Sequence, residues 1–339
     1  MNSKPYEGLT PDAVLDALES VGLRGDGRML ALNSYENRVY QVSLEDDTGR
    51  TEGGGPSVVV AKFYRPHRWS EAQLLEEHAF AAELVGREIP VVAPFALDGK
   101  TLNTFNDIRF AVFPRRGGRA PELESEEVLV WIGRFLGRIH AVGATRPFQA
   151  RPTLNVETFG TEPRNWLNAS GMIPEDLKDS WITTVDLALR SVQNHFQIRE
   201  TRAIRLHGDC HAGNILWTEG GNTTLGGPHF VDLDDARMGP AVQDLWMLLA
   251  GDRPTATRQL RAMLEGYEQF HAFNREQLGL IEPLRTLRLI HYSAWLARRW
   301  DDPAFPAAFP WFGTHRYWQD RILELREQTS NMDEAPLDV

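Results

Sequence analysis

The spacing of apolar residues changes near residue 114, and this change limits the folds that the chain can adopt. Before it, short β-branched and aromatic runs such as 58–64 alternate with polar or glycine-rich turns, as in antiparallel strands. After it, apolar residues recur every three to four positions, as in amphipathic helices. The sequence therefore predicts an α+β fold with a small β-rich N-terminal lobe and a larger helical C-terminal lobe.

Proline and glycine residues mark the boundaries of the two predicted lobes. We expect an N-terminal lobe at 1–113, a hinge at 114–121, a helical lobe at 122–330 and a frayed polar tail at 331–339. A chain of 339 residues is long enough for two such lobes.

Local signals place the elements within each lobe. Thr10 before Pro11 marks a helix over 11–21, and Ser70 with Gln73 has the capping-box spacing of a helix that ends near Gly86. The predicted strands span 29–32, 40–44, 58–64, 91–96 and 109–113, with a short β island near 213–233. The predicted helices of the second lobe span 124–142, 176–198, 241–250, 254–272, 280–299 and 314–329.

The composition excludes several classes of protein. The chain has 36 Lys and Arg against 47 Asp and Glu, a formal net charge of −11, so sequence-independent binding of nucleic acid is not expected. Its apolar runs are shorter than the roughly 18 to 20 residues that span a bilayer, and its first residues lack a secretory signal. The single cysteine, Cys210, has no intrachain disulfide partner. We expect a cytoplasmic protein that binds neither nucleic acid nor membrane.

The run from His207 to Asn214 carries the most specific chemical signal. Asp209 is followed five residues later by Asn214, and a second carboxylate, Asp232, lies 23 positions after Asp209. Phosphoryl transfer uses such a set, with one carboxylate to accept the proton of the attacking hydroxyl and an amide and a second carboxylate to hold magnesium against nucleotide phosphates. Upstream, the strand lysine Lys62 supplies a charge for the phosphates. A helix glutamate, Glu77 or with less support Glu76, is expected to orient that lysine.

The same run resembles the catalytic loop of the aminoglycoside-phosphotransferase-like kinases, a branch of the protein-kinase fold. Together, the runs 32–40, 62–66, 206–214 and 230–237 are similar to the bacterial stress response kinase A family, and the likeness covers nearly the whole chain. It implies a bilobal protein-kinase-like fold and a monomeric serine/threonine protein kinase of the bacterial cytoplasm that uses ATP and Mg²⁺ and is linked to stress survival. Its partner is then a protein substrate with a serine or threonine acceptor.

The resemblance also implies a role for each matching position. Asp209 takes the place of the catalytic base, and Asn214 and Asp232 take the places of the magnesium ligands, with Asp232 standing where the Asp-Phe-Gly aspartate lies. Ser34 corresponds to a nucleotide-loop contact, and Lys62 and Glu77 correspond to the ion pair that orients the phosphates. By analogy, Asp244 at a helix start is expected to brace the catalytic loop by accepting backbone N–H bonds.

Two departures from the protein-kinase pattern affect these predictions. The nucleotide hairpin has Asn33-Ser34-Tyr35 instead of a glycine-rich motif, so side-chain groups are expected to share the phosphate contacts. Gly208 stands where many protein kinases carry an arginine that binds a phosphorylated activation loop, and only 8 positions separate Asp232 from Pro240. We therefore predict a site that is assembled without loop phosphorylation.

Alternative functions remain open at the level of sequence. The same loop serves small-molecule kinases whose acceptors are homoserine-, choline- or aminoglycoside-like alcohols. A nucleotide-binding regulator without turnover and a zinc site built from His207, Cys210 and His211 are less consistent with the motif. Arg298 and Arg299 are candidates for attracting an acidic acceptor, although arginines at a helix end are commonly just exposed.

Overall fold

The computed structural model describes residues 5–45, 58–199, 202–220 and 226–339. Its contacts divide the chain into two compact units that do not follow chain order. The first comprises the described residues of Met1–Pro121 with two later segments, Gln149–Arg151 and Gly213–Asp234. The second comprises Glu122–Phe148, Pro152–Ala212 and Asp235–Val339. The predicted lobes were continuous stretches, so the two inserted segments depart from that prediction.

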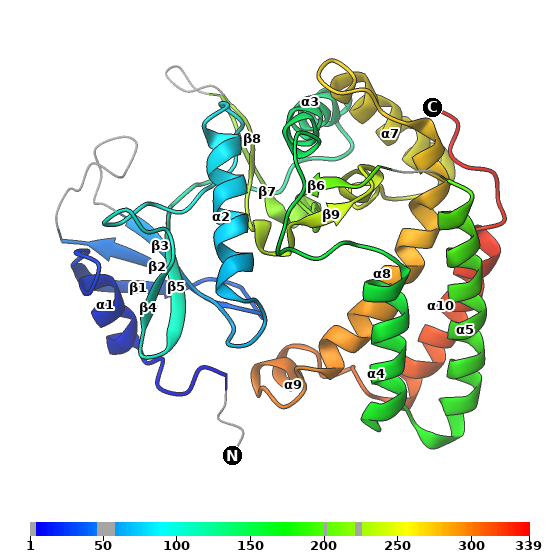
Figure 1. Ribbon diagram of the computed structural model, residues 1–339, viewed down its shortest axis with the longest axis horizontal. Helices are drawn as coiled ribbons and strands as arrows, with labels where there is room; N and C mark the ends of the chain where they lie inside the picture. The colour runs from blue at the N-terminus through cyan, green and yellow to red at the C-terminus, as the bar shows by residue number, and fades with distance from the viewer. Residues whose placement is uncertain (1–4, 46–57, 200–201, 221–225) are drawn as a thin grey trace. The chain divides into compact units, whose positions relative to one another are not determined.

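A five-stranded antiparallel sheet forms the centre of the first unit (Figure 1), with the strand order β1-β2-β3-β5-β4. The strands are β1 (Gly25–Ala31), β2 (Arg38–Leu44), β3 (Val58–Phe63), β4 (Asn103–Phe105) and β5 (Ile108–Pro114). Lys62 of β3 pairs with Val39 on one side and Ala111 on the other, so it lies on an inner strand.

Two helices pack against this sheet. Helix α1 (Pro11–Glu19) places Val14 and Leu18 in a core with alternate residues of β3 and β5, including Phe63 and Phe110. Helix α2 (Glu71–Val85) places Leu74 against Ala111 in a separate cluster. Because successive strand residues point to opposite faces, α1 and α2 cover opposite faces of the sheet.

A short hairpin and three residues of a distant segment complete the first unit. In the hairpin, β7 (Ile215–Thr218) pairs with β8 (Gly227–Phe230). Residues 149–151 are attached through the carboxylate of Glu76 on α2, which accepts backbone N–H bonds from Gln149, Ala150 and Arg151 at 2.5, 2.8 and 2.8 Å. Glu76 is therefore fully used as a brace for this segment.

The second unit is mainly helical (Figure 1). Its main helices are α3 (Glu126–Gly143), α4 (Glu162–Ser170), α5 (Glu175–Gln197), α6 (Val242–Trp246), α7 (Arg253–Tyr267), α8 (Ile281–Ala297), α9 (Ala304–Ala308) and α10 (His315–Asn331). Helices α3 and α7 approach each other so closely that a Cβ on Gly133 would lie 2.0 Å from the carbonyl oxygen of Met263. A second core joins α4, α5, α8 and α10 around Trp181 and Trp318.

A short ladder in the second unit supports the predicted catalytic loop. Strand β6 (Ile204–Leu206) leads into that loop, and β9 (Arg237–Gly239) pairs with it from Ile204↔Gly239 to Leu206↔Arg237. Neither strand is long enough to give a clear pattern in the sequence, since each has only three residues.

The predicted α+β class is confirmed, and most predicted helices are found to within a few residues. The predicted strand at 91–96 is wrong, because only Val91 forms an isolated bridge there, to Phe230. Two helices were not predicted: α4 begins directly after a π-helical turn at 157–161, and α9 has only five residues and contains Pro306. In the described part of the chain, no helix has the length and apolar character needed to cross a membrane.

Candidate functional site

Lys62 lies on the face of the sheet that α2 covers. Val59, Ala61 and Phe63 of the same strand pack on the α1 side, so Lys62 must point the other way. Its side chain is buried, and its Nζ lies 2.6 Å from Oδ1 of Asp232 and 3.5 Å from Oδ1 of Asp234. Burial alone would lower the pKa of Lys62, but the carboxylates of Asp232, Asp234 and Glu77 outweigh it and raise this pKa. The lysine is therefore a fixed positive charge.

Glu77 is buried on the same side of the sheet but does not complete the predicted pair. Among the described residues, the ion pairs of Lys62 are with Asp232 and Asp234 and not with Glu77. The predicted Lys62–Glu77 pair is thus wrong for this structure, because two other carboxylates converge on the single ammonium group. Burial raises the pKa of Glu77 to about 7, against the opposing effect of Lys62. The alternative partner, Glu76, is occupied by backbone N–H groups.

Asp234 is a central residue of this site that the sequence analysis did not single out. It is 3% exposed, accepts a hydrogen bond from Nδ2 of Asn37 at 2.9 Å and forms an ion pair with Arg68. Its carboxylate thus ties together the turn after β1, the segment after β3 and Lys62. The second acid in Asp232-Leu233-Asp234 is a signal that could have pointed to it.

Asp232 and Asn214 come together at one end of the β7–β8 hairpin. The N–H of Val231 donates to the carbonyl oxygen of Asn214 at 3.0 Å, directly beyond the pairing of Ile215 with Phe230. Asp232 has a φ of +61°, a left-handed conformation that aspartate tolerates better than most residues. Its side chain is half exposed. This turn aims one carboxylate outward while the other, on Asp234, stays buried.

The donor set at this hairpin suits a magnesium ion bound partly by substrate. Carboxylate and amide oxygens are hard ligands, and magnesium sites in phosphoryl-transfer enzymes use one or two carboxylates together with the phosphates of the nucleotide. Asn214 and Asp232 offer one amide and one half-exposed carboxylate. No group of three or more His, Cys, Asp or Glu side chains that could hold a metal occurs in the described residues. The residues fit a shared site better than an all-protein metal cage.

Ser34 lies in the turn between β1 and β2, where it is half-buried. The same turn carries Glu36, which pairs with Arg65 at 2.9 Å, and Asn37, whose Oδ1 accepts the N–H of Arg65 at 3.1 Å. These contacts fix the turn against the segment that follows Lys62. The first unit thus contains Ser34, Lys62, Glu77, Asn214 and Asp232.

Asp209 belongs to the second unit, in a loop that is held by Asp244. The Asp244 carboxylate is fully buried and accepts the N–H groups of His207 and Gly208, each at 2.8 Å. Nε2 of His140 lies 3.0 Å from its Oδ2. Burial would raise the pKa of Asp244, but these donors and His140 lower it below the usual range. The predicted brace by Asp244 is confirmed.

Gly208 is required by the shape of the loop. Its φ is +87°, and a Cβ at this position would lie 2.1 Å from the carbonyl oxygen of Asp235. The same oxygen accepts the Nε–H of Arg237 at 2.7 Å. The position therefore excludes the arginine that many protein kinases place there.

The carboxylate of Asp209 has an unpredicted partner, Arg288 of α8. Nη1 of Arg288 donates to Oδ1 of Asp209 at 2.8 Å, and Nε2 of His211 lies 3.6 Å from Oδ2. The two residues are 79 positions apart in the chain, so no local sequence pattern predicts this pair. Asp209 is 25% exposed at its side chain and is thus open to solvent.

The alternative zinc site is not assembled. Cys210 is fully buried, and burial, with the charges of Asp244 and Asp209, raises the pKa of its thiol well above the usual value. His207 is also buried, whereas the side chain of His211 is partly exposed and lies beside the carboxylate of Asp209. The loop thus uses Cys210 as a packed, unreactive side chain.

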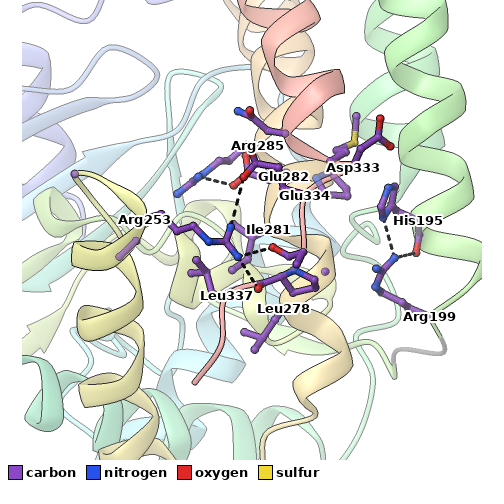
Figure 2. Close-up of a pocket in the computed structure, with 18 residues that line it drawn as sticks. His195, Arg199, Arg253, Leu278, Ile281, Glu282, Arg285, Asp333, Glu334 and Leu337 are labelled. Atoms are coloured by element: carbon purple, nitrogen blue, oxygen red, sulfur yellow. Dashed lines mark hydrogen bonds and ion pairs between the residues drawn. The ribbon is translucent and has the colours of Figure 1, made fainter.

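A separate cavity of about 420 Å³ lies in the second unit among α7, α8 and the C-terminal segment (Figure 2). Arg253 closes one side by donating to the carbonyl oxygens of Ala335 and Pro336 at 2.5 and 2.7 Å, while Glu334 lies 3.6 Å from its Nη1. None of the predicted site residues lines it. We expected the tail at 331–339 to be frayed. Instead, the Arg253 guanidinium holds it by hydrogen bonds to two of its backbone carbonyl groups.

Comparison with known proteins is consistent with this arrangement. Residues 29–281 match the Phosphotransferase enzyme family. The chain is 46% identical over 332 residues to "Stress response kinase A" of Escherichia coli (strain K12), covering 98% of this chain and 96% of that relative. It is 44% identical over 336 residues to "Serine/threonine protein kinase RdoA" of Salmonella typhimurium (strain LT2), covering 99% and 97%.

Solved structures with low sequence identity share the fold. An amicoumacin kinase in complex with AMP-PNP, Ca²⁺ and its ligand aligns with a TM-score of 0.71 at 18% identity and covers 96% of this chain and 94% of that one. A microcompartment-associated aminopropanol kinase aligns with a TM-score of 0.66 at 16% identity and covers 94% and 96%. The family match and the near-full-length relatives together show that this chain is a phosphotransferase of the Phosphotransferase enzyme family and belongs, within it, to the stress response kinase A family.

Proposed function

We propose that the chain is a serine/threonine protein kinase that uses ATP and Mg²⁺. The observation that carries the proposal is the 2.6 Å contact between Lys62 and Asp232, next to Asn214 at the end of the β7–β8 hairpin. A buried cation beside a half-exposed carboxylate and an amide is the set of groups that phosphates and magnesium need. The name of the Salmonella relative supports a serine or threonine acceptor.

In the proposed reaction, Asp209 accepts the proton of the acceptor hydroxyl as its oxygen attacks the γ-phosphorus of ATP. The bond from this phosphorus to the bridging oxygen breaks, and its electron pair leaves with ADP. Asn214 and Asp232 hold magnesium, which supplies positive charge to the phosphates when bound. Lys62 adds a fixed charge and keeps Asp232 oriented through their contact.

The stress response is the proposed setting, since relatives at 45 and 46% identity are named stress response kinase A. We also propose that the kinase acts in the cytoplasm as a monomer. These proposals rest on the family and on the absence of a membrane-crossing helix among the described residues.

The direct test is transfer of label from γ-labelled ATP with Mg²⁺ to a bacterial extract that has been split into a protein and a metabolite fraction. We expect label on serine or threonine of proteins, and none with the Asp209→Asn variant. Label in the metabolite fraction alone would replace the protein acceptor by a small alcohol. No transfer to either fraction would contradict a kinase activity.

A further inference from the structure

Arg288 donates a hydrogen bond to the Asp209 carboxylate, and the proposed reaction gives it no role. It lies in the middle of α8, and its Nη1 bonds to Oδ1 of Asp209 at 2.8 Å and lies 3.9 Å from Sδ of Met247. Within the described residues, its Nε and Nη2 donate no hydrogen bond. Its side chain is 40% exposed, so this second edge of the guanidinium is open to an incoming molecule.

Arg288 is one of three arginines that lie close to His291, although the chain as a whole is acidic. His291 lies one turn further along the same face of α8 and stacks on Phe159 with ring centres 4.1 Å apart. Burial, together with the nearby charges of Arg237, Arg288 and Arg299, lowers the pKa of His291 to about 3, while Asp235 opposes this shift. Arg237 pairs with Asp235 at 2.5 Å, so these two charges offset each other.

We propose that Arg288 selects the acceptor: its free Nε–Nη2 edge binds an anionic residue of the substrate protein next to the serine or threonine that Asp209 deprotonates. This inference rests on the proposed function. A guanidinium presents two parallel N–H groups that match a carboxylate or a phosphate. An extended peptide rises about 3.3 Å per residue, so the anionic residue lies within about two positions of the acceptor. The anion is an aspartate or glutamate, or a residue that is already phosphorylated.

Arg298 and Arg299, which the sequence suggested for an acidic acceptor, are placed differently. Arg298 lies over the ring of Trp166 at 5.4 Å, and Nη1 of Arg299 donates to the carbonyl oxygen of Trp295 at 3.1 Å. Arg288, in contrast, donates directly to Oδ1 of Asp209. The position of Arg288, and not its charge alone, makes it the selecting residue.

The test compares three sets of peptides that share one serine or threonine and differ only in their neighbours. One set has aspartate or glutamate within two positions of the acceptor, one has phosphoserine there, and one has alanine. For the wild type, we expect kcat/KM to be about tenfold or more higher with an anionic neighbour than with alanine, the size of a charge-assisted hydrogen bond. The first two sets distinguish a carboxylate from a phosphate ligand.

The variant Arg288→Gln should reduce this ratio to near one, because glutamine keeps the length but lacks the charge. The matched control is Arg285→Gln, one turn earlier on α8, where the arginine pairs with Glu282 at 2.7 Å; it should keep the ratio. The ratio is the informative readout, since a purely structural role of Arg288 would lower both rates in the same proportion.

The outcomes separate the two proposals. Phosphorylation of all three peptide sets with equal efficiency, or an unchanged ratio in Arg288→Gln, would overturn the selection by Arg288 and leave the protein kinase in place. No phosphorylation of any peptide by the wild type would overturn the serine/threonine acceptor itself and the selection with it.

Discussion

Lys62 is a single buried cation that acts on three carboxylates, those of Glu77, Asp232 and Asp234. Lys62 pairs with Asp232 and Asp234, and Arg68 also pairs with Asp234, so Glu77 is the one of the three that has no ion pair among the described residues. A buried carboxylate without an ion pair favours its neutral, protonated form. Glu77 is the one that the structure favours for the proton. It is buried, it has no ion pair with Lys62 among the described residues, and its pKa is raised to about 7.

This proton makes stability depend on pH in a definite direction. Because the pKa of Glu77 is higher in the folded chain than its usual value of 4.5, its contribution is fully present below that value and is lost as pH rises through about 7. The variant Glu77→Gln keeps the neutral form at every pH. We expect the difference in melting temperature between this variant and the wild type, measured by calorimetry, to shift in favour of the variant as the pH rises from 5 to 8.

The exposed Glu265 on α7 provides a matched control, and Glu265→Gln should show no such trend. A Glu77→Gln variant whose melting temperature stays parallel to the wild type over this range would show that Glu77 is already ionised in the folded chain at pH 5.

Gly208 gives a second prediction at the scale of one residue. Replacement by alanine would combine the cost of a left-handed conformation with a clash of Cβ against the carbonyl oxygen of Asp235. Gly27 has the same φ of +87° with nothing within 4 Å of its Cβ position, so Gly27→Ala isolates the conformational cost. That cost is about 1 to 2 kcal/mol.

We expect Gly208→Ala to lower the free energy of unfolding by clearly more than Gly27→Ala, and to lower the phosphoryl-transfer rate as well. Urea titration and a transfer assay of both variants check this. Equal destabilisation of the two variants would mean that the loop relaxes away from Asp235 without cost.

At the scale of elements, the β6–β9 ladder fixes the segment that activation loops occupy in many protein kinases. Backbone pairing holds 237–239 to 204–206, and Arg237 pairs with Asp235 within the same segment. No phosphate is needed to form these contacts. We expect the transfer rate to be unchanged after treatment with a protein phosphatase, with mass spectrometry to confirm removal of any phosphate. A transfer rate that falls once the phosphatase has removed phosphate from the chain would contradict this.

The elements also show what the sequence could and could not predict. Ser70 and Gln73 form the expected capping box. Helix bounds could be predicted from the sequence because caps and apolar spacing are local signals. The segment after Val91 has strand-like residues but finds only one bridge, since strand pairing depends on distant partners. Helix α4 begins directly after a π-helical turn at 157–161, a geometry that apolar spacing does not reveal.

The same distinction applies to the candidate site. Asp209, Asn214, Asp232 and Lys62 stand in recognisable local patterns, and so does Asp244. Asp234 and Arg288 were missed because their partners are distant in the sequence. The partners of Asp234 are 166 and 197 positions away, and Asp209 is 79 positions from Arg288. The Lys62–Glu77 pair failed for the same reason, since it required knowing how many carboxylates reach the lysine.

At the scale of the whole molecule, the acidic chain contains two local clusters in which cations pair with carboxylates. One is Lys62 with Arg68 around the carboxylates of the first unit, and the other is Arg288 with its neighbours in the second. A net charge of −11 disfavours the nonspecific attraction of polyanions to the chain.

The central claim is that Asp209 is the base of a phosphoryl transfer from ATP, and the variant Asp209→Asn tests it most directly. Single-turnover transfer of label to the preferred acceptor should fall by about 10² to 10⁴, the usual contribution of a general base. Its melting temperature and its affinity for ATP with Mg²⁺ should stay close to those of the wild type, because asparagine keeps the size of the side chain. Transfer at a rate near that of the wild type would contradict the claim.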